Sequence, residues 1–260
     1  MRVALGVSYR GQAYHGWQSQ RGGNTVQDRL ENALARFADR PVRTMCAGRT
    51  DAGVHALNQV VHFDTDAVRA ESSWIRGTNR FLPADIAVQW CRFPDLEFHA
   101  RYSAMGRRYS YVLLESAVRP AIEAGLVGWS FRPLDEVAMR AAVGHLIGEL
   151  DFSAFRSSEC QARSPVKTMR SIEISRRGPY LRFDFDANAF LHHMVRNLMG
   201  CLVAIGSGAR DEAWLAQIVA ARDRSRSAPT FPADGLYFVG PYYDPVHAIV
   251  ERTSAMNWLP

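Results

Sequence analysis

Several short stretches of the chain alternate apolar and polar residues, and this two-residue period is typical of half-buried β-strands. The sequence therefore predicts strands over 3–9, 43–47, 57–63, 86–90, 106–114, 167–175, 180–187 and 235–239. Other stretches repeat apolar residues every three or four positions, which is the period of an amphipathic helix. This second pattern predicts helices over 26–37, 71–81, 134–147, 190–205 and 211–220.

Start and stop signals support the first two helices. Thr25 is a good N-cap residue, and Asp28 lies in the first turn, where the helix dipole favours a negative charge. Pro41 is expected to end this helix, and the Leu82-Pro83 pair is expected to end the second. The two helices therefore have definite limits in the sequence.

The order of the predicted elements indicates the fold class. The first half reads strand, helix, strand, strand, helix, strand, which is the order of a ferredoxin-like unit, and the second half repeats it. We expect an α+β fold with two ferredoxin-like (βαββαβ) halves, whose antiparallel sheets lie side by side and form a central cleft. The expected domains are 1–104 and 105–260, with 115–129 as a connecting excursion.

Composition narrows the class of protein. Hydrophobic residues make up 47% and charged residues 22%, as in ordinary soluble proteins. No apolar run reaches the length of a membrane span, and the first residues resemble a strand rather than a signal peptide, so we expect a cytoplasmic protein. The four cysteines are too far apart in the sequence to form a zinc knuckle or a redox pair.

The charge of the chain points weakly to an acidic partner. The net charge is +5, and Lys167 is the only lysine, so the positive charge is almost all arginine. Arginine binds phosphate with two N–H groups and stacks on bases, whereas lysine acts as a point charge. A codon-usage bias toward arginine would produce the same composition, and this alternative stays open.

The segment 48–56 has the densest group of functional side chains. Asp51 lies between Gly48 and Gly53, with Arg49 two residues before it. The two glycines allow backbone angles that other residues resist. From local chemistry alone, a catalytic carboxylate and a simple Asx-turn are equally good interpretations.

This segment resembles the signature of the tRNA pseudouridine synthase A family. The resemblance extends from Tyr9 to about Tyr237, and its other matching segments are 9–18, 98–104, 107–111, 151–156, 190–197, 228–229 and 235–236. The chain departs from the family pattern at three places. Asn58 replaces a usual glycine, Ser110 replaces a common basic residue, and residues 77–81 replace the usual Leu-Asn-Ala-Leu run. The resemblance implies the pseudouridine synthase fold.

The resemblance also implies roles for individual residues. Asp51 would be the catalytic nucleophile, and Arg156 would pair with its carboxylate. Tyr109 would contact the target uracil and act as the base for the final C5 proton. Arg49 would help to move the target nucleotide out of its stack. Arg196, on the long apolar helix, could reach the substrate.

Isomerisation of uridine breaks the bond between C1′ and N1 and forms one between C1′ and C5. Asp51 could attack C6 of the base or assist departure of the base at C1′, and the sequence does not choose between these routes. Neither route needs a cofactor, and we expect none. We also expect no metal, because His192 and His193 are adjacent, the wrong spacing for two ligands on one helix face.

The family acts on uridines 38, 39 and 40 of the tRNA anticodon arm as a homodimer, so the resemblance implies that substrate and that assembly. Two other functions are compatible with the residues alone. A non-catalytic RNA-binding protein built from paired RRM-like units would have the same element order. A hydrolase of glycosidic bonds would need a second carboxylate, for which Asp64 and Asp66 are the candidates.

Overall fold

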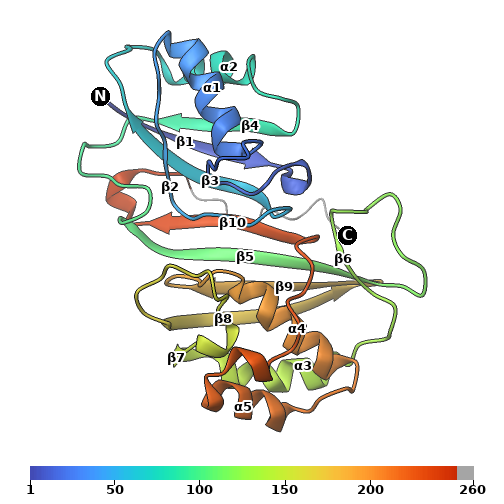
Figure 1. The fold of residues 1–260 in the computed structure, drawn as a ribbon. Helices are drawn as coiled ribbons and strands as arrows, with labels where there is room; N and C mark the ends of the chain where they lie inside the picture. Colours follow the sequence, from blue (N-terminus) through green and yellow to red (C-terminus); the bar gives the residue numbers. More distant parts are fainter. Residues whose placement is uncertain (251–260) are drawn as a thin grey trace. The chain divides into compact units, whose positions relative to one another are not determined.

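The structure is a computed structural model that describes residues 1–250. The chain forms two compact units (Figure 1). The first contains Met1–Arg107 together with the described residues from Tyr237 on, and the second contains Arg108–Leu236. Both units combine helices with a mostly antiparallel sheet, which confirms the α+β class. The predicted domains 1–104 and 105–260 remain a prediction.

The first unit is built on a sheet with strand order β4-β1-β3-β10, to which β2 adds by pairing with β3. β1 is antiparallel to both β3 and β4, whereas β10 is parallel to β3. The strands of this unit are β1 (Arg2–Tyr9), β2 (Met45–Cys46), β3 (His55–Asp64), β4 (Ile86–Arg92) and β10 (Leu236–Tyr243). Its helices are α1 (Val26–Ala38) and α2 (Glu71–Asn79).

Helix α1 starts where the sequence predicts. The Thr25 side chain accepts a hydrogen bond from the Asp28 N–H, and the Asp28 carboxylate accepts one from the Thr25 N–H, so the two residues form a capping box. The helix ends at Asp39, which adopts a left-handed conformation with φ of 53°. Pro41 follows just after this end, as expected.

Aromatic side chains join α1, α2 and the sheet of the first unit. The ring of Trp74, on α2, is completely buried and packs edge-on against Phe37 of α1 and Phe63 of β3. The centroid separations are 5.2 and 5.3 Å. Buried aromatic pairs of this geometry stabilise a fold beyond the area that they bury. Both helices are thereby fixed to the sheet.

The last strand of the chain pairs within the first unit. The strand predicted over 235–239 is present as β10, and it lies parallel to β3, with Tyr237 opposite His55. Tyr243 follows on β10, and its hydroxyl donates to the Ala100 carbonyl at 2.7 Å. The sequence could not predict this return, because the whole second unit, Arg108–Leu236, separates the first segment from β10.

The second unit has the strand order β5-β9-β8-β7, with β6 parallel to β5. Its strands are β5 (Ala104–Glu115), β6 (Gly128–Ser130), β7 (Gly148–Asp151), β8 (Val166–Arg177) and β9 (Tyr180–Ala187). Its helices are α3 (Glu136–Val143), α4 (Met194–Gly206) and α5 (Glu212–Ala221). β8 and β9 form the predicted hairpin, with Arg177 opposite Tyr180.

Two helices of the second unit are shorter than predicted. Asp135 caps α3 by accepting from the Ala138 N–H, so this helix starts two residues late, and a 3-10 turn replaces its last residues. The predicted helix 190–205 starts only at Met194, because His193 adopts a left-handed conformation with φ of 62°. Short 3-10 helices cover Gly11–Ala13, Gly144–Leu146, Ser153–Phe155, Arg224–Arg226 and Pro245–His247.

None of the helices in residues 1–250 has both the length and the apolar character needed to cross a lipid bilayer. The four cysteines are all free of disulfide bonds. Cys91 and Cys201 are buried, and Cys46 and Cys160 are half-buried, in keeping with small apolar residues.

Candidate functional site

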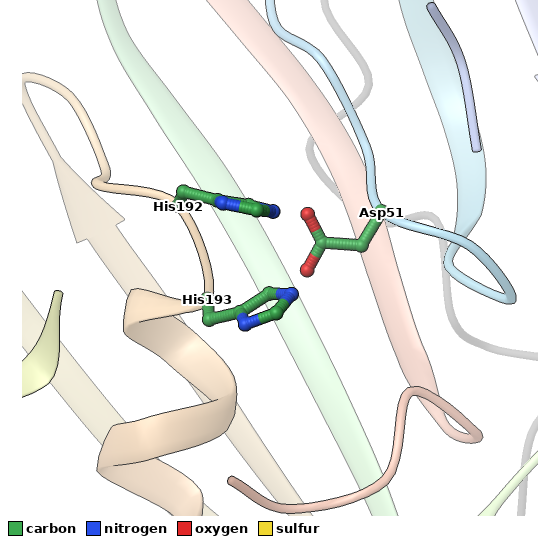
Figure 2. A group of neighbouring side chains, drawn as sticks. All are labelled: Asp51, His192 and His193. Atoms are coloured by element: carbon green, nitrogen blue, oxygen red, sulfur yellow. The ribbon is translucent and has the colours of Figure 1, made fainter. Parts of the chain in front are cut away.

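Asp51 lies on the loop between β2 and β3, in the first unit (Figure 2). The loop closes with a turn in which the Val54 N–H donates to the Asp51 carbonyl at 3.2 Å. Gly53 has a φ of 81°, a left-handed conformation that favours glycine, as the sequence suggests. The Asp51 side chain is half-buried, and Arg49 is exposed.

Thr50 fixes the loop directly before the acid. Its side chain is buried and shares a hydrogen bond of 2.7 Å with the Tyr9 hydroxyl at the end of β1. Its carbonyl accepts from the Trp17 N–H at 3.0 Å. Burial raises the pKa of Tyr9 well above its usual value, so this hydroxyl stays neutral. The residue beside Asp51 is therefore held from two directions.

The glycine-punctuated segment 10–18 packs against the Asp51 loop. A Cβ at Gly16, whose φ is +84°, would lie 2.6 Å from the Thr50 carbonyl oxygen. The Gly11 N–H donates to Nδ1 of His55 at 3.1 Å, at the start of β3. Only glycine allows such close approach of two backbones, and this contact explains Gly11 and Gly16, whereas Gly48 has neither a close backbone neighbour nor a left-handed conformation.

Arg107 braces the other end of the loop. Its Nη2 donates to the Ala47 carbonyl at 3.1 Å and to the Arg101 carbonyl at 2.7 Å. Strand alternation places Arg107 on the same face as Tyr109, but its bond to the loop joins residues 60 positions apart. No local pattern in the sequence reveals that contact.

Two carboxylates follow the Asp51 loop, and both take part in ion pairs. Asp64 accepts from Nε and Nη2 of Arg2, each at 2.8 Å, and this guanidinium holds the pKa of the carboxyl below its usual value. Asp66 pairs with Arg40 at 3.3 Å. Both candidates for the second carboxylate of a glycosidic hydrolase are therefore paired with an arginine.

Tyr109 lies on β5, in the second unit, and is half-buried. Its ring meets the ring of Phe190 edge-on, with the centroids 5.0 Å apart. This contact limits the rotation of the phenol. The structure therefore presents Tyr109 as a braced and partly accessible ring.

The other residues of the 107–111 motif are used for packing and pairing. Tyr111 is fully buried and its hydroxyl donates to the Pro232 carbonyl at 3.1 Å, so this residue packs in the core. Ser110 donates to Asp184 of β9, and Arg108 donates to Asp186 at 3.1 Å. These bonds fix β5 to its neighbouring strand on both sides of Tyr109.

Arg156 follows the 3-10 turn Ser153–Phe155, in the second unit. Its Nη2 donates to the Cys160 carbonyl at 2.7 Å and to the Ala162 carbonyl at 2.9 Å. The loop that follows is thereby folded around the guanidinium. The role expected for Arg156 toward a carboxylate remains a prediction.

His192 and His193 directly precede α4 (Figure 2), and their rings lie 4.0 Å apart at 41°. The Ser157 N–H donates to the His192 carbonyl at 3.1 Å, and the His192 N–H donates to Sγ of Cys160 at 3.4 Å. These contacts join the pair to the Arg156 loop. The helix-face spacing used to judge these histidines does not apply, because both lie before the helix.

Arg196, on α4, bonds to the segment before β10. Its contact with a substrate remains a prediction. Its Nε donates to the Phe231 carbonyl at 2.8 Å, and its carbonyl accepts from the Phe231 N–H at 3.1 Å. Beside it, the fully buried Asn197 donates to the Phe155 carbonyl at 2.8 Å and accepts from Arg224 at 3.1 Å. Arg224 also donates to the Ala228 carbonyl at 3.0 Å, so its guanidinium has a structural role.

The five residues proposed from the sequence are divided between the units. Asp51 and Arg49 belong to the first unit, and Tyr109, Arg156 and Arg196 belong to the second. Within the second unit, the Arg156 loop contacts the segment that leads into α4. Arg107, Thr50 and Asn197 position candidate residues, although the sequence does not single them out for function.

Comparison with known proteins identifies relatives of the whole chain. A family profile described as "tRNA pseudouridine synthase" matches residues 6–103 and 142–244. The chain is 71% identical to the tRNA pseudouridine synthase A of Methylibium petroleiphilum and 65% identical to that of Polaromonas naphthalenivorans. Both matches cover 100% of this chain and 100% of the relative.

Among solved structures, the chain is similar to part of the crystal structure of a Cbf5-Nop10-Gar1 complex. The match has 11% identity and a TM-score of 0.39, and it covers 78% of this chain and 45% of the other.

Proposed function

Because this chain belongs to the tRNA pseudouridine synthase family, we propose that it isomerises uridine to pseudouridine in the tRNA anticodon arm, at positions 38, 39 and 40. The family assignment rests on a profile that covers most of the chain and on full-length relatives of high identity. It makes the protein an isomerase that modifies tRNA.

Asp51 is the residue that we propose as the nucleophile. The observation that carries this role is the fixation of its loop, in which Thr50 bonds both Tyr9 and Trp17 directly before the acid. A nucleophile gains rate from being held in one geometry before the substrate arrives. In either chemical route, the C1′–N1 bond breaks, C1′ bonds to C5, and the C5 proton leaves, so no cofactor is required.

The other roles follow the same proposal. Tyr109 would stack against the target uracil and accept the C5 proton, and its contact with Phe190 supports this by bracing the ring. Arg156 would keep the Asp51 carboxylate ionised, since a nearby cation lowers the pKa of a carboxyl. Arg49, exposed on the loop, would help to displace the target nucleotide from its stack, and Arg196 would contact the substrate.

Three further properties belong to the proposal as well. We expect the protein to act as a homodimer in the cytoplasm, where tRNA is its partner. We also expect the two halves of the chain to be related ferredoxin-like units, as the order of elements in the first unit supports.

Replacement of Asp51 tests the proposed function. We expect Asp51→Ala to lower the rate of pseudouridine formation on unmodified tRNA by at least about 10³-fold, because the nucleophile is lost. Binding of tRNA should change by less than about threefold, since one carboxylate adds no affinity for an anion. The measurements are chemical detection of pseudouridine and a direct binding assay on the same protein.

Asp66→Asn is a matched control, because it also removes one negative charge, from an ion pair with Arg40. This control should form pseudouridine at the wild-type rate. The proposal fails if the wild-type protein leaves every uridine unchanged, or if Asp51→Ala retains normal turnover.

A further inference from the structure

A cavity of about 630 Å³ lies in the first unit, beside helix α1. It is lined by the segment around Tyr14, by one face of α1, and by residues 81–83 that follow α2. The polar, charged and aromatic side chains of its lining are Tyr14, Asn24, Arg29, Asn32, Arg36 and Phe81. We call this set the α1 pocket.

Two guanidinium groups give the α1 pocket a positive charge. Arg29 and Arg36 are seven residues apart on α1, which places them on the same face about 10 Å apart along the axis. Asn32 lies between them, and all three side chains are exposed. Neither arginine has a carboxylate oxygen of residues 1–250 within ion-pair distance, although Arg29 is close enough to Asp28 to favour the ionised form of that carboxyl. The N–H groups of both guanidinium groups therefore remain available to a ligand.

Neutral contacts hold both guanidinium groups in place. The Arg36 guanidinium lies 4.2 Å from the centre of the Phe81 ring. Nη2 of Arg29 donates to the side-chain oxygen of Asn24 at 3.3 Å, and Asn24 itself donates to the Ala13 carbonyl at 2.8 Å. Contacts of this kind orient an arginine and leave most of its N–H groups unused.

The carboxylates next to the pocket are engaged elsewhere. Asp85 accepts a hydrogen bond of 2.6 Å from the Tyr14 hydroxyl. Asp28 accepts from the Thr25 hydroxyl at 2.6 Å and from the Thr25 N–H at 3.3 Å, the second bond being part of the α1 capping box. Their hydrogen bonds fix Asp85 to Tyr14 and Asp28 to the cap, and only Asp28 acts on one of the two arginines, through the charge of Arg29.

We propose that the α1 pocket binds two backbone phosphates of the tRNA substrate, one at Arg29 and one at Arg36. This inference rests on the proposed function for its ligand, a tRNA. Arginines that are oriented but unpaired match phosphate oxygens, and a neighbouring aromatic ring and amide suit a nucleotide strand.

The pocket is also connected to the Asp51 loop through the first unit. Tyr14 and Trp17 lie on the same short segment, and the Trp17 N–H bonds the Thr50 carbonyl directly before Asp51. A strand held at the α1 pocket is thereby held against the segment that supports the acid. Loss of the pocket should weaken RNA binding rather than the chemical step.

The double variant Arg29→Gln/Arg36→Gln tests the proposal. Each phosphate contact contributes roughly 0.7–0.9 to the slope of log affinity against log salt, so this slope should fall by about 1.4–1.8. At about 0.15 M salt, the affinity for an unmodified tRNA transcript should fall by about tenfold, and kcat/KM by a similar factor. Binding is measured by titration of tRNA at several salt concentrations.

The matched control is Arg40→Gln/Arg69→Gln, which removes the same charge from exposed arginines of the first unit. Arg40 pairs with Asp66, and Arg69 donates to the neighbouring Val68 carbonyl, so neither lines the pocket. This control should reduce the slope by less than about 0.5. Equal slopes for the two double variants would overturn the proposal, because general charge would then explain the effect.

A second variant, Asn32→Asp, keeps both arginines and adds ion pairs that support the helix. The new carboxylate lies three residues after Arg29 and four before Arg36, spacings at which helix ion pairs are stabilising. We expect unchanged or higher thermal stability together with weaker tRNA binding. Unchanged tRNA affinity would contradict the proposal.

Failure of this inference can be told apart from failure of the proposed function. The binding assay does not depend on turnover, so a wild-type protein that makes no pseudouridine would refute only the activity. Conversely, normal pseudouridine formation with an unchanged salt slope in Arg29→Gln/Arg36→Gln would refute only the pocket.

Discussion

His62, on β3, is buried next to groups that disfavour its charge. The side chain is 4% exposed, and its Nδ1 accepts from the Ala100 N–H at 3.2 Å. Burial lowers the pKa of His62 to about 4, and repulsion by His99 and Arg2 contributes. An ionised imidazole cannot accept that hydrogen bond, so the folded protein holds this residue neutral.

We expect His62 to make stability depend on pH between about 6.5 and 4. In this range the unfolded chain binds a proton that the folded chain excludes, so stability falls as the pH falls. The total loss of unfolding free energy is at most about 3.5 kcal/mol, from the usual 1.4 kcal/mol for each of about 2.5 pKa units. Urea unfolding at several pH values measures it.

His62→Gln, which keeps a hydrogen-bond acceptor without a proton to gain, should make the curve between pH 6.5 and 4 less steep, with His99, whose pKa burial also lowers, supplying the remaining slope. Lowered carboxyl pKa values, such as that of Asp64, act mainly below this range and serve as an internal reference. A variant with the same pH profile as the wild type would show that His62 is not the source.

At the scale of an element, α4 shows how closely a helix can approach its neighbour. A Cβ at Gly200 would lie 2.2 Å from the Pro229 carbonyl oxygen, so the missing side chain allows this contact. The helix is otherwise lined by buried apolar residues such as Leu198 and Leu202. The periodic apolar face of α4 is visible in the sequence, whereas the segment around Pro229 that packs against it is not.

We predict that Gly200→Ala destabilises the protein by about 1–3 kcal/mol, because the backbone must move apart to admit a methyl group. Gly144→Ala is the matched control, since its Cβ would meet nothing within 4 Å at the end of α3. That change should be neutral or stabilise by up to about 1 kcal/mol. Chemical denaturation compares the two free energies of unfolding, and equal values would contradict the packing argument.

At the scale of the whole molecule, the first unit is completed by the last strand of the chain. Tyr237, Phe238 and Tyr243 of β10 are each at most 4% exposed, so they contribute to the core of that unit. Complete burial of one such side chain stabilises the folded state by about 1.5–3 kcal/mol, whereas the total free energy of unfolding of a domain is only about 5–15 kcal/mol. The segment Met1–Arg107 is thus an incomplete folding unit.

A pair of fragments tests this dependence. We expect residues 1–107 alone to be unfolded or aggregated, and residues 1–107 joined through a flexible linker of about 15 Gly and Ser residues to 236–250 to fold. Circular dichroism and cooperative urea unfolding distinguish the two outcomes. Equal stability of the two fragments would show that β10 is not required.

Much of this protein is determined by short stretches of its sequence. The α1 helix with its Thr25 cap, the hairpin β8–β9 and the turn at Gly53 after Asp51 follow from local periodicity, capping and backbone freedom. The family resemblance is likewise carried by contiguous motifs, and the full-length relatives confirm it.

Other features were decided only by the tertiary structure. The start of α4 depends on the left-handed His193, the support of the Asp51 loop on Thr50 and Arg107, and the pairing of β10 on a strand far away in the chain. Local patterns report what a segment prefers by itself. The partner of a buried polar group or of a strand edge depends on the whole fold. The free energy of that hydrogen bond or strand pairing is set by groups that lie elsewhere in the chain.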